Sequence, residues 1–246
     1  MKLILLRHGE SEWNLSNQFT GWVDVNLTDL GIQEAQIAGN KLLEEKISIN
    51  TINTSILNRA INTAKIVSSI ISFNESCIKQ SWRLNERHYG KLQGLNKSQT
   101  AKIYGEKQVH IWRRSFDIPP PKIHIKDKMH PSNFKKFAKI DKINLPTGES
   151  LSDVIIRLKP FWNNYIKEIT ELGGNHLIVA HSNSLRAILK ILKNLTDKEI
   201  TSVNIPTGIP LVIEIDKNKI IGEKYLIDET SLKVKQKHIA NQGKIK

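Results

Sequence analysis

The chain has 246 residues, of which 39% are hydrophobic and 25% are charged, and its formal net charge is +13. No apolar run approaches the roughly 18 residues that a membrane-spanning helix needs, and charged residues end the first apolar run too early for a signal peptide. A single cysteine, Cys77, excludes an internal disulfide framework and fits a reducing compartment. We therefore expect one α/β domain over residues 1–246 in a cytoplasmic protein that neither spans nor binds a membrane.

The first predicted element is a strand. Four aliphatic residues, Leu3–Leu6, end abruptly in Arg7, His8 and Gly9. Such a run predicts a strand buried on both faces, and ligands of open α/β sheets bind outside the carboxyl ends of the strands. The sequence therefore predicts a ligand site at His8, whose imidazole beside a cation indicates a nucleophile for a phosphoryl group.

The next elements alternate. A loop over 16–27 precedes a helix that begins after the N-cap Thr28 and runs to about Lys46. Residues 47–55 alternate isoleucine with polar residues, which predicts a strand, and 58–71 form a second amphipathic pattern. Strand, helix, strand and helix in this order predict a parallel, right-handed arrangement.

The middle of the chain is less regular. Short helices are expected over 97–104 and 106–114, and Pro119–Pro121 should stop the second of them. A basic loop follows to about Leu145, too long for a simple connection. We expect an insertion over about 82–145 that covers the site like a lid.

The second half repeats the opening pattern. A helix is expected over 150–172, kinked or broken at Pro160 and ended by glycines. The run His176–Ala180 then predicts another strand, followed by His181, small polar residues and a helix over 185–195. Strands at 211–216 and 220–226 form a predicted hairpin, and a polar, mobile tail is expected over about 228–246.

Two histidines at the ends of two buried strands can face each other if the strands are neighbours. His8 and His181 would then bracket a phosphoryl group, with Arg7 and Arg59 supplying positive charge. The alternative for each histidine is a surface or capping role. Glu86 is the candidate general acid and base, and a salt bridge to a neighbouring arginine stays open as its alternative.

The remaining charged residues indicate neither a metal site nor a nucleic-acid site. No HExxH or paired-cysteine spacing is present, so we expect no metal. Lysines are scattered without a block of like charges, whereas the eight arginines lie mostly near other candidate residues. Because arginine suits bidentate recognition of phosphate and carboxylate, we expect a small anionic ligand and no nucleic acid.

Six segments together resemble the cofactor-dependent phosphoglycerate mutases of the histidine phosphatase superfamily. They are RHGESEWN (Arg7–Asn14), FTGW (Phe19–Trp22), LNERHYG with LQGLNK (84–97), WRRSF (Trp112–Phe116), HSNSLRA (His181–Ala187) and NIPTGIPLV (Asn204–Val212). The terminal NQGK (241–244) also fits, so the resemblance covers nearly the whole chain. It implies a three-layer α/β sandwich with a mostly parallel central sheet flanked by helices.

The resemblance also implies an activity: exchange of 3-phosphoglycerate and 2-phosphoglycerate through phosphorylated His8, primed by 2,3-bisphosphoglycerate. Glu86 would move protons, and His181 would stabilise the transferring phosphoryl. The chain would be a homodimer or homotetramer, and its tail would cover the site. The implied binding residues are Arg7, His8, Gly9, Glu10, Ser11, Glu12, Trp13, Asn14, Thr20, Gly21, Arg59, Glu86, Arg87, His88, Tyr89, Lys97, Arg113, Arg114, Ser182 and Asn183.

Two departures from the family pattern accompany this resemblance. Ser182 stands where the family has glycine after the second histidine, and its β-carbon would crowd a bound phosphate. The loop between Pro121 and Leu145 is short and lacks the family's Asp-Arg-Tyr segment. A phosphatase on the same scaffold, in which water takes the phosphoryl, is the nearest alternative activity. A nucleic-acid binder and a catalytically dead homologue are more distant ones.

Overall fold

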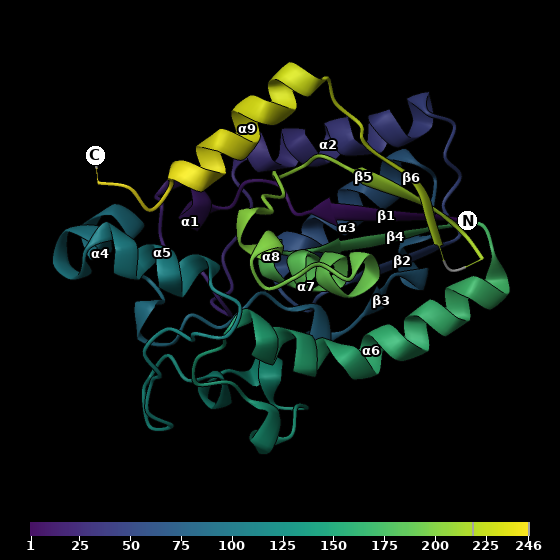
Figure 1. The fold of residues 1–246 in the computed structure, drawn as a ribbon. Helices are drawn as coiled ribbons and strands as arrows, with labels where there is room; N and C mark the ends of the chain where they lie inside the picture. Colours follow the sequence, from purple (N-terminus) through teal and green to yellow (C-terminus); the bar gives the residue numbers. More distant parts are fainter. Residues whose placement is uncertain (218, 246) are drawn as a thin grey trace.

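A six-stranded mixed sheet runs through the middle of the computed structural model, which describes residues 1–217 and 219–245 (Figure 1). Its strands are β1 (Lys2–Arg7), β2 (Thr51–Thr54), β3 (Lys79–Gln80), β4 (Asn175–Ala180), β5 (Leu211–Asp216) and β6 (Lys219–Tyr225). Their order in the sheet is β3-β2-β4-β1-β5-β6. The first four are mutually parallel, whereas β5 runs antiparallel to both of its neighbours. The predicted mostly parallel sheet is therefore confirmed.

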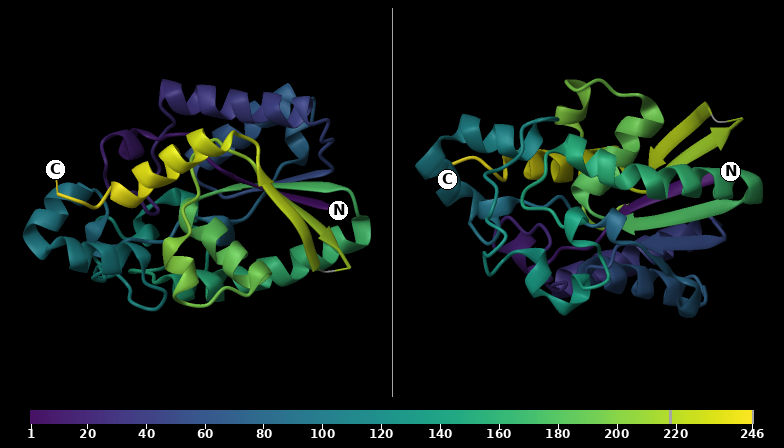
Figure 2. Two further views of the ribbon diagram at one scale, coloured as in Figure 1. Left: turned by 45° about the horizontal axis from the view of Figure 1, so that its top comes forward. Right: turned by 90° about the horizontal axis from the view of Figure 1, so that it is seen from below.

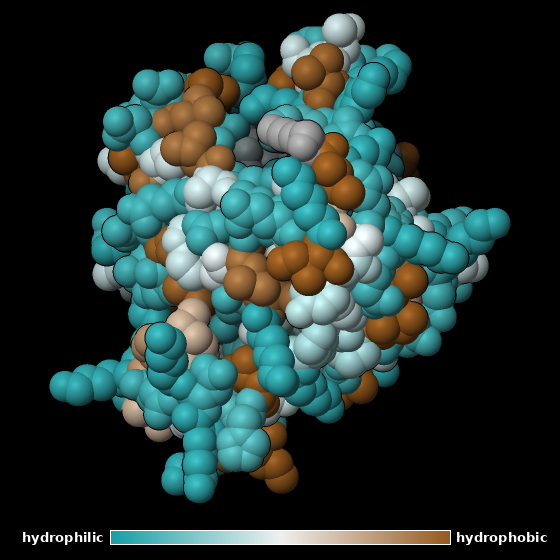
Figure 3. Space-filling view, turned by 90° about the vertical axis from the view of Figure 1, so that its left-hand side faces the viewer, coloured by the Kyte–Doolittle hydropathy of each residue, from teal (hydrophilic) through white to brown (hydrophobic). Residues whose placement is uncertain are grey.

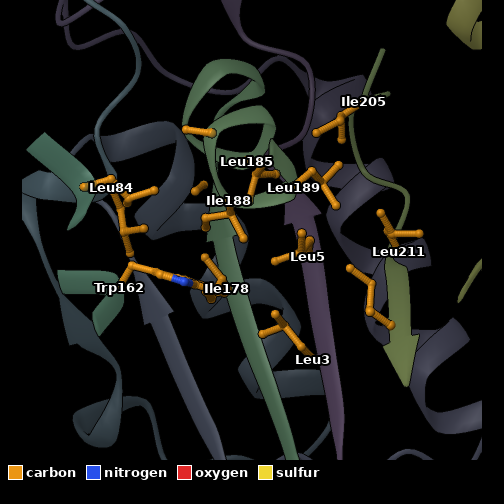
Figure 4. Packing of buried hydrophobic residues seen from close by; sticks show 14 of the residues in the cluster. Leu3, Leu5, Leu84, Trp162, Ile178, Leu185, Ile188, Leu189, Ile205 and Leu211 are labelled. Carbon is orange, nitrogen blue, oxygen red and sulfur yellow. The ribbon is translucent and has the colours of Figure 1, made fainter. Parts of the chain in front are cut away.

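The sheet is buried on both faces because β1 alternates its side chains between two clusters. Leu3 and Leu5 pack with α6 (Leu151–Leu172) and α7 (Ser182–Lys193) on one face, as Figure 4 shows for part of this cluster. Ile4 and Leu6 pack with α2 (Asp29–Glu44) and α3 (Asn58–Ile70) on the other face. The two further views show these helical layers on opposite sides of the strands (Figure 2). The three-layer prediction is confirmed.

Most of the long helices begin where the sequence indicated. Thr28 and Ser150 accept backbone N–H groups as N-caps of α2 and α6. Pro160 does not break α6, which continues to Leu172, so only a kink remains possible there. The strand predicted over 47–55 is regular only over Thr51–Thr54.

The insertion forms α4 (Lys97–Tyr104) and α5 (Glu106–Arg114) within the predicted bounds. However, α5 ends at Arg114, so Pro119–Pro121 does not stop it. Short 3₁₀ turns occupy parts of this region and its neighbours: η1 (Glu75–Cys77), η2 (Trp82–Leu84), η3 (Gly90–Leu92), η4 (Pro131–Asn133), η5 (Lys135–Phe137) and η6 (Lys142–Asn144). Phe137 and Ile140 of the basic loop pack against Trp22, which fixes the loop beside the domain.

Three helices were not predicted: α1 (Glu12–Leu15), α8 (Glu199–Ser202) and α9 (Glu229–Asn241). The last lies in the tail and runs above the carboxyl end of β1 toward α4 and α5 (Figure 1). Its polar composition leaves one buried residue, Ile239, which explains why hydrophobic periodicity did not indicate it. None of the helices within 1–217 and 219–245 has the length and apolar character needed to cross a membrane.

Candidate active site

The two strand-end histidines lie beside each other. β1 and β4 pair in parallel with Arg7 opposite Ala180, and the backbone N–H of His8 donates to the carbonyl of Ala180 over 3.0 Å. His8 and His181 are the next residues on the two strands. Their ring centroids are 4.9 Å apart at an interplanar angle of 62°. The strands that carry the two histidines are therefore neighbours, as bracketing of a phosphoryl group by His8 and His181 requires.

The imidazole of His8 is buried and held at both nitrogens. Nδ1 lies 2.6 Å from the carbonyl oxygen of Gly9, which requires a proton on Nδ1. Nε2 then carries the lone pair and accepts from Nε of Arg59 at 3.3 Å. Burial, together with the charges of Arg59 and Arg7, holds the pKa of His8 well below its usual range. The free ring is therefore a neutral nucleophile.

His181 is the N-cap residue of α7 and is fully buried. Its Nε2 lies 2.7 Å from Oγ of Ser55, and its Nδ1 has no hydrogen-bond partner among the described residues. Burial and the nearby Arg59 keep its pKa well below the usual range. The helix predicted over 185–195 starts earlier, so Ser182 and Asn183 form the first turn of α7 and direct its N-terminus toward the site.

A pocket opens in front of His8, and positive side chains dominate its walls. It is lined by Arg7, His8, Asn14, Gln18, Thr20, Gly21, Arg59, Glu86, Tyr89, Lys97, Arg113, Arg114, Ser182, Asn183, Ile239 and Gln242. Glu86 contributes the one carboxylate among these residues. Segments far apart in the chain therefore build a site suited to an anion of high charge.

The cations are placed by main-chain carbonyls rather than by acids. Arg59 donates to the carbonyls of Gly21 and Val23 at 2.9 Å each, and Arg7 donates to the carbonyl of Ile205 at 2.9 Å. Burial lowers the pKa of Arg59 to about 10. Burial and the neighbouring arginines hold the pKa of Lys97 well below its ordinary value. Such desolvated cations gain strongly from a bound anion.

Glu86 faces the same pocket from an irregular segment. Its Oε1 accepts the backbone N–H groups of Arg87 at 2.7 Å and Asn183 at 3.2 Å. The alternative salt bridge to a neighbouring arginine side chain is not formed in the described part of the chain. The side chain of Asn183 donates to the hydroxyl of Tyr89 at 3.1 Å. Glu86 is thus attached to the first turn of the helix that follows His181.

Several predicted binding residues lie outside the pocket lining: Gly9, Glu10, Ser11, Glu12, Trp13, Arg87 and His88. Ser11 caps α1 through a capping box with Asn14, so it shapes the loop that follows His8. The ring of His88 is buried near Trp22, at 6.3 Å between centroids. Arg87 donates to the carbonyl of Arg113 at 2.8 Å and so supports the end of α5.

Sequence reasoning missed three lining residues. Ile239 and Gln242 come from α9 and its end, and Gln18 comes from the loop after α1. Arg113 donates to the carbonyl of Ile239 at 3.2 Å, which brings the tail onto the pocket. The terminal NQGK motif was the available signal, because it implied a functional role for a tail without apolar periodicity. Figure 3 views this side of the molecule, where hydrophobic residues are scattered among hydrophilic ones.

The chemistry of this site follows from its parts. A neutral imidazole presents a lone pair, cations and a helix N-terminus surround the attacked group, and a carboxyl group can carry a proton. In residues 1–217 and 219–245, no group of three or more histidine, cysteine, aspartate or glutamate side chains is arranged to hold a metal ion. The arrangement supports phosphoryl transfer through a phosphohistidine.

Comparisons with known proteins agree with this chemistry. Residues 3–226 match the histidine phosphatase superfamily (branch 1). The chain is 49% identical over 247 residues to a 2,3-bisphosphoglycerate-dependent phosphoglycerate mutase of Treponema denticola, covering 100% of both. Among solved structures, a mycobacterial hydrolase has a TM-score of 0.68 at 22% identity, with 92% and 96% of the two chains covered. A protein of Bacillus stearothermophilus has a TM-score of 0.64 at 24% identity, with 89% and 93% covered. These two structures share the fold.

Proposed function

The chain belongs to the histidine phosphatase superfamily, and from this premise we propose its reaction and the roles of its residues. It is a 2,3-bisphosphoglycerate-dependent phosphoglycerate mutase, which interconverts 3-phosphoglycerate and 2-phosphoglycerate. The observation that carries the residue roles is the facing pair His8 and His181 in a cation-lined pocket with Glu86.

His8 is the proposed nucleophile. Its Nε2 attacks phosphorus, a nitrogen–phosphorus bond forms, and the bond from phosphorus to the substrate oxygen breaks. The hydrogen bond from Nδ1 to Gly9 supports this role because it keeps the proton off Nε2. In the reverse half of the cycle, a phosphoglycerate hydroxyl attacks phosphorus and the phosphoryl leaves Nε2.

Glu86 is the proposed proton carrier. It gives its proton to the substrate oxygen that leaves phosphorus, and it takes a proton from the hydroxyl that attacks the phosphohistidine. Because each transfer reverses the other, Glu86 is regenerated over one complete cycle. Its two backbone N–H donors support the role, since they fix the carboxyl at the pocket wall.

The remaining polar residues stabilise charge. Arg7, Arg59 and the Nδ1–H tautomer of His181 would donate to the phosphoryl oxygens, where negative charge gathers during transfer. Arg113, Arg114 and Lys97 would hold the rest of the substrate. They would also retain the doubly phosphorylated intermediate long enough for it to reorient, which separates a mutase from a phosphatase.

The residues present fit 2,3-bisphosphoglycerate. Buried Arg7 Nε has no hydrogen-bond partner in the described part of the chain, and the lining carries several cations against one carboxylate. When bound, this group supplies the phosphoryl that first charges His8. Arg7, Arg59, Lys97, Arg113 and Arg114 would hold it. We expect no metal to be needed, because these cations surround the phosphate positions.

Labelling tests the assignment. We expect ³²P-labelled 2,3-bisphosphoglycerate to give an acid-labile, base-stable phosphoenzyme, and His8→Ala to remove the label. Undiminished labelling of His8→Ala would overturn the role of His8. A coupled assay with and without added 2,3-bisphosphoglycerate should show isomerisation faster than release of inorganic phosphate. Release without isomerisation would indicate a phosphatase instead.

Three expectations from the sequence remain predictions: a homodimer or homotetramer, a cytoplasmic location, and a lid role for about 82–145. Size-exclusion chromatography with light scattering would decide the oligomeric state.

A further inference from the structure

Glu86 lies on a segment that lacks regular structure of its own. After the 3₁₀ turn Trp82–Leu84, the chain has neither helix nor strand until Gly90, yet Glu86 is buried. A proton carrier has to be held within hydrogen-bond reach of the reacting oxygen. Backbone hydrogen bonds of a helix or sheet do not supply this placement here, so other groups have to supply it.

Arg157 of α6 holds the main chain of this segment, together with Trp22, whose Nε1 donates to the carbonyl of Glu86 at 2.7 Å. Nη1 of Arg157 donates to the carbonyls of Trp82 at 3.4 Å and Arg83 at 2.7 Å. Its Nη2 donates to the carbonyls of Asn85 at 3.2 Å and Glu86 at 3.3 Å. One rigid, planar guanidinium therefore spans most of the segment up to Glu86.

Glu149 holds this guanidinium and the far side of the segment at once. Its Oε1 accepts from Nε of Arg157 at 2.7 Å, and its Oε2 accepts from Nη2 at 3.2 Å. The same Oε2 accepts the backbone N–H of His88 at 2.8 Å, and the N–H of Glu149 donates to the carbonyl of His88. The segment is thus fastened on both sides of Glu86.

The ion pair is buried, with 6% side-chain exposure for each partner. Burying two charges costs free energy unless their geometry and hydrogen bonds compensate, so such a pair is weak evidence for stability. Here every donor of the guanidinium has a partner, and four of the contacts go to the carbonyls of the Glu86 segment. Neither Arg157 nor Glu149 lines the catalytic pocket.

We propose that Arg157, paired with Glu149, is a positioning residue that aims the Glu86 carboxyl at the substrate oxygen. This inference rests on the proposed proton-carrier role of Glu86. It predicts a defect specific to reactions in which the leaving oxygen needs a proton.

Two phosphoryl donors separate that defect from general damage to the site. When His8 takes a phosphoryl from 2,3-bisphosphoglycerate, the departing alkoxide must receive a proton from Glu86. When His8 takes it from p-nitrophenyl phosphate, p-nitrophenolate departs as a stable anion and needs no proton. The first-turnover release of p-nitrophenolate therefore reports on His8, Arg59 and His181 without Glu86.

The variant is Arg157→Lys in the full chain. We expect kcat for isomerisation to fall about 10- to 100-fold with KM within about 3-fold. The first-turnover rate with p-nitrophenyl phosphate should stay within about 3-fold of the wild type. Glu86→Gln should give the same pattern, because it removes the proton carrier itself. Ile169→Ala, a core truncation further along α6, is the control for lost stability and should leave both rates unchanged at 25 °C.

An equal fall in both rates, or no fall in either, would overturn the positioning role. If Arg157→Lys does not fold, Glu149→Gln serves as the second variant, because it removes the charge that pairs with Arg157 and keeps the shape of the side chain. The same two rates, isomerisation and first-turnover p-nitrophenolate release, then decide the question. Failure of the proposed function would look different, since the wild-type protein would then show no isomerisation. The ratio of the transfer rate from an alkyl phosphate to that from p-nitrophenyl phosphate, compared between the wild type and Arg157→Lys, would still report whether Glu86 is correctly positioned.

Discussion

Gly9 and Gly31 approach each other so closely that a β-carbon on Gly9 would overlap the carbonyl group of Gly31. Gly31 is equally confined, because a β-carbon there would overlap the carbonyl oxygen of Glu10, the residue after Gly9. This contact presses the first turn of α2 against the loop that follows His8. Both glycines are therefore required by space, although neither has a positive φ.

Gly31→Ala should destabilise the protein. Alanine in place of glycine inside a helix ordinarily adds about 1 kcal/mol of stability. Here the added carbon meets backbone, which cannot rotate away, so we expect a loss of about 1–3 kcal/mol in urea unfolding. Gly39→Ala on the same helix is the matched variant. The three atoms nearest to its β-carbon all belong to the side chain of Ile70, the nearest at 3.0 Å, so this variant should cost less. A stabilised Gly31→Ala protein would contradict this interpretation.

His88 should make stability depend on pH. Burial lowers its pKa from 6.5 to about 3, so below pH 6.5 the unfolded chain binds a proton that the folded protein does not bind. Stability is then lost as the pH falls from 6.5 toward 3. We expect His88 to account for about 2 kcal/mol of loss between pH 6.5 and 5.

His88→Asn isolates this contribution, because the asparagine oxygen can still accept the N–H of Gly90 that Nδ1 accepts now. Urea unfolding of both proteins at pH 7, 6 and 5 should show a shallower dependence for the variant. Parallel curves would mean that His88 gains its proton in the folded state as readily as in the unfolded one.

Ile239→Ala should increase hydrolysis of the phosphohistidine relative to isomerisation. Ile239 is the buried residue of α9 and lines the catalytic pocket. Its truncation would admit water to the phosphohistidine while His8 and Glu86 stay in place. We expect the ratio of phosphate release to isomerisation to rise roughly 3- to 10-fold. Val234→Ala, exposed on the same helix, is the control and should leave the ratio unchanged.

Ser182→Gly should change binding little. Ser182 begins α7 with an ordinary negative φ, so its β-carbon creates no backbone strain and its N–H already has the helical direction. We expect KM for 3-phosphoglycerate within about 3-fold of the wild type and a loss of about 0.5–1 kcal/mol in stability. A large drop in KM would show instead that the serine crowds the bound phosphate.

Most strands and long helices were predictable because local signals determine them, whereas the two-residue strand β3 and the polar helix α9 were not. Leu3–Leu6 and His176–Ala180 are fully apolar or nearly so, and Thr28 and Ser150 are ordinary N-caps. The facing of His8 and His181 was predicted on the condition that their strands are neighbours, and the parallel pairing of β1 with β4 meets that condition.

The supports of the site were not predictable in the same way. In the sequence, Arg157 cannot be distinguished from the other charged residues of an amphipathic helix. Its four carbonyl partners are brought to it by tertiary packing. Likewise α9 is too polar for a hydrophobic period to indicate it, since it rests on contacts such as Lys235 with Glu34. Main-chain hydrogen bonding over long separations leaves no pattern in a single sequence.

The pairing of β1 with β4 has a consequence for biosynthesis. β1 leaves the ribosome first but sits between two strands that come from the last third of the chain. His8 therefore cannot meet His181 until most of the protein has been made, and contacts this distant in sequence close slowly. An N-terminal fragment released early would expose the hydrophobic strand β1 and would lack phosphoryl-transfer activity. We therefore expect the nascent chain to bind chaperones until β4 and β5 have been made.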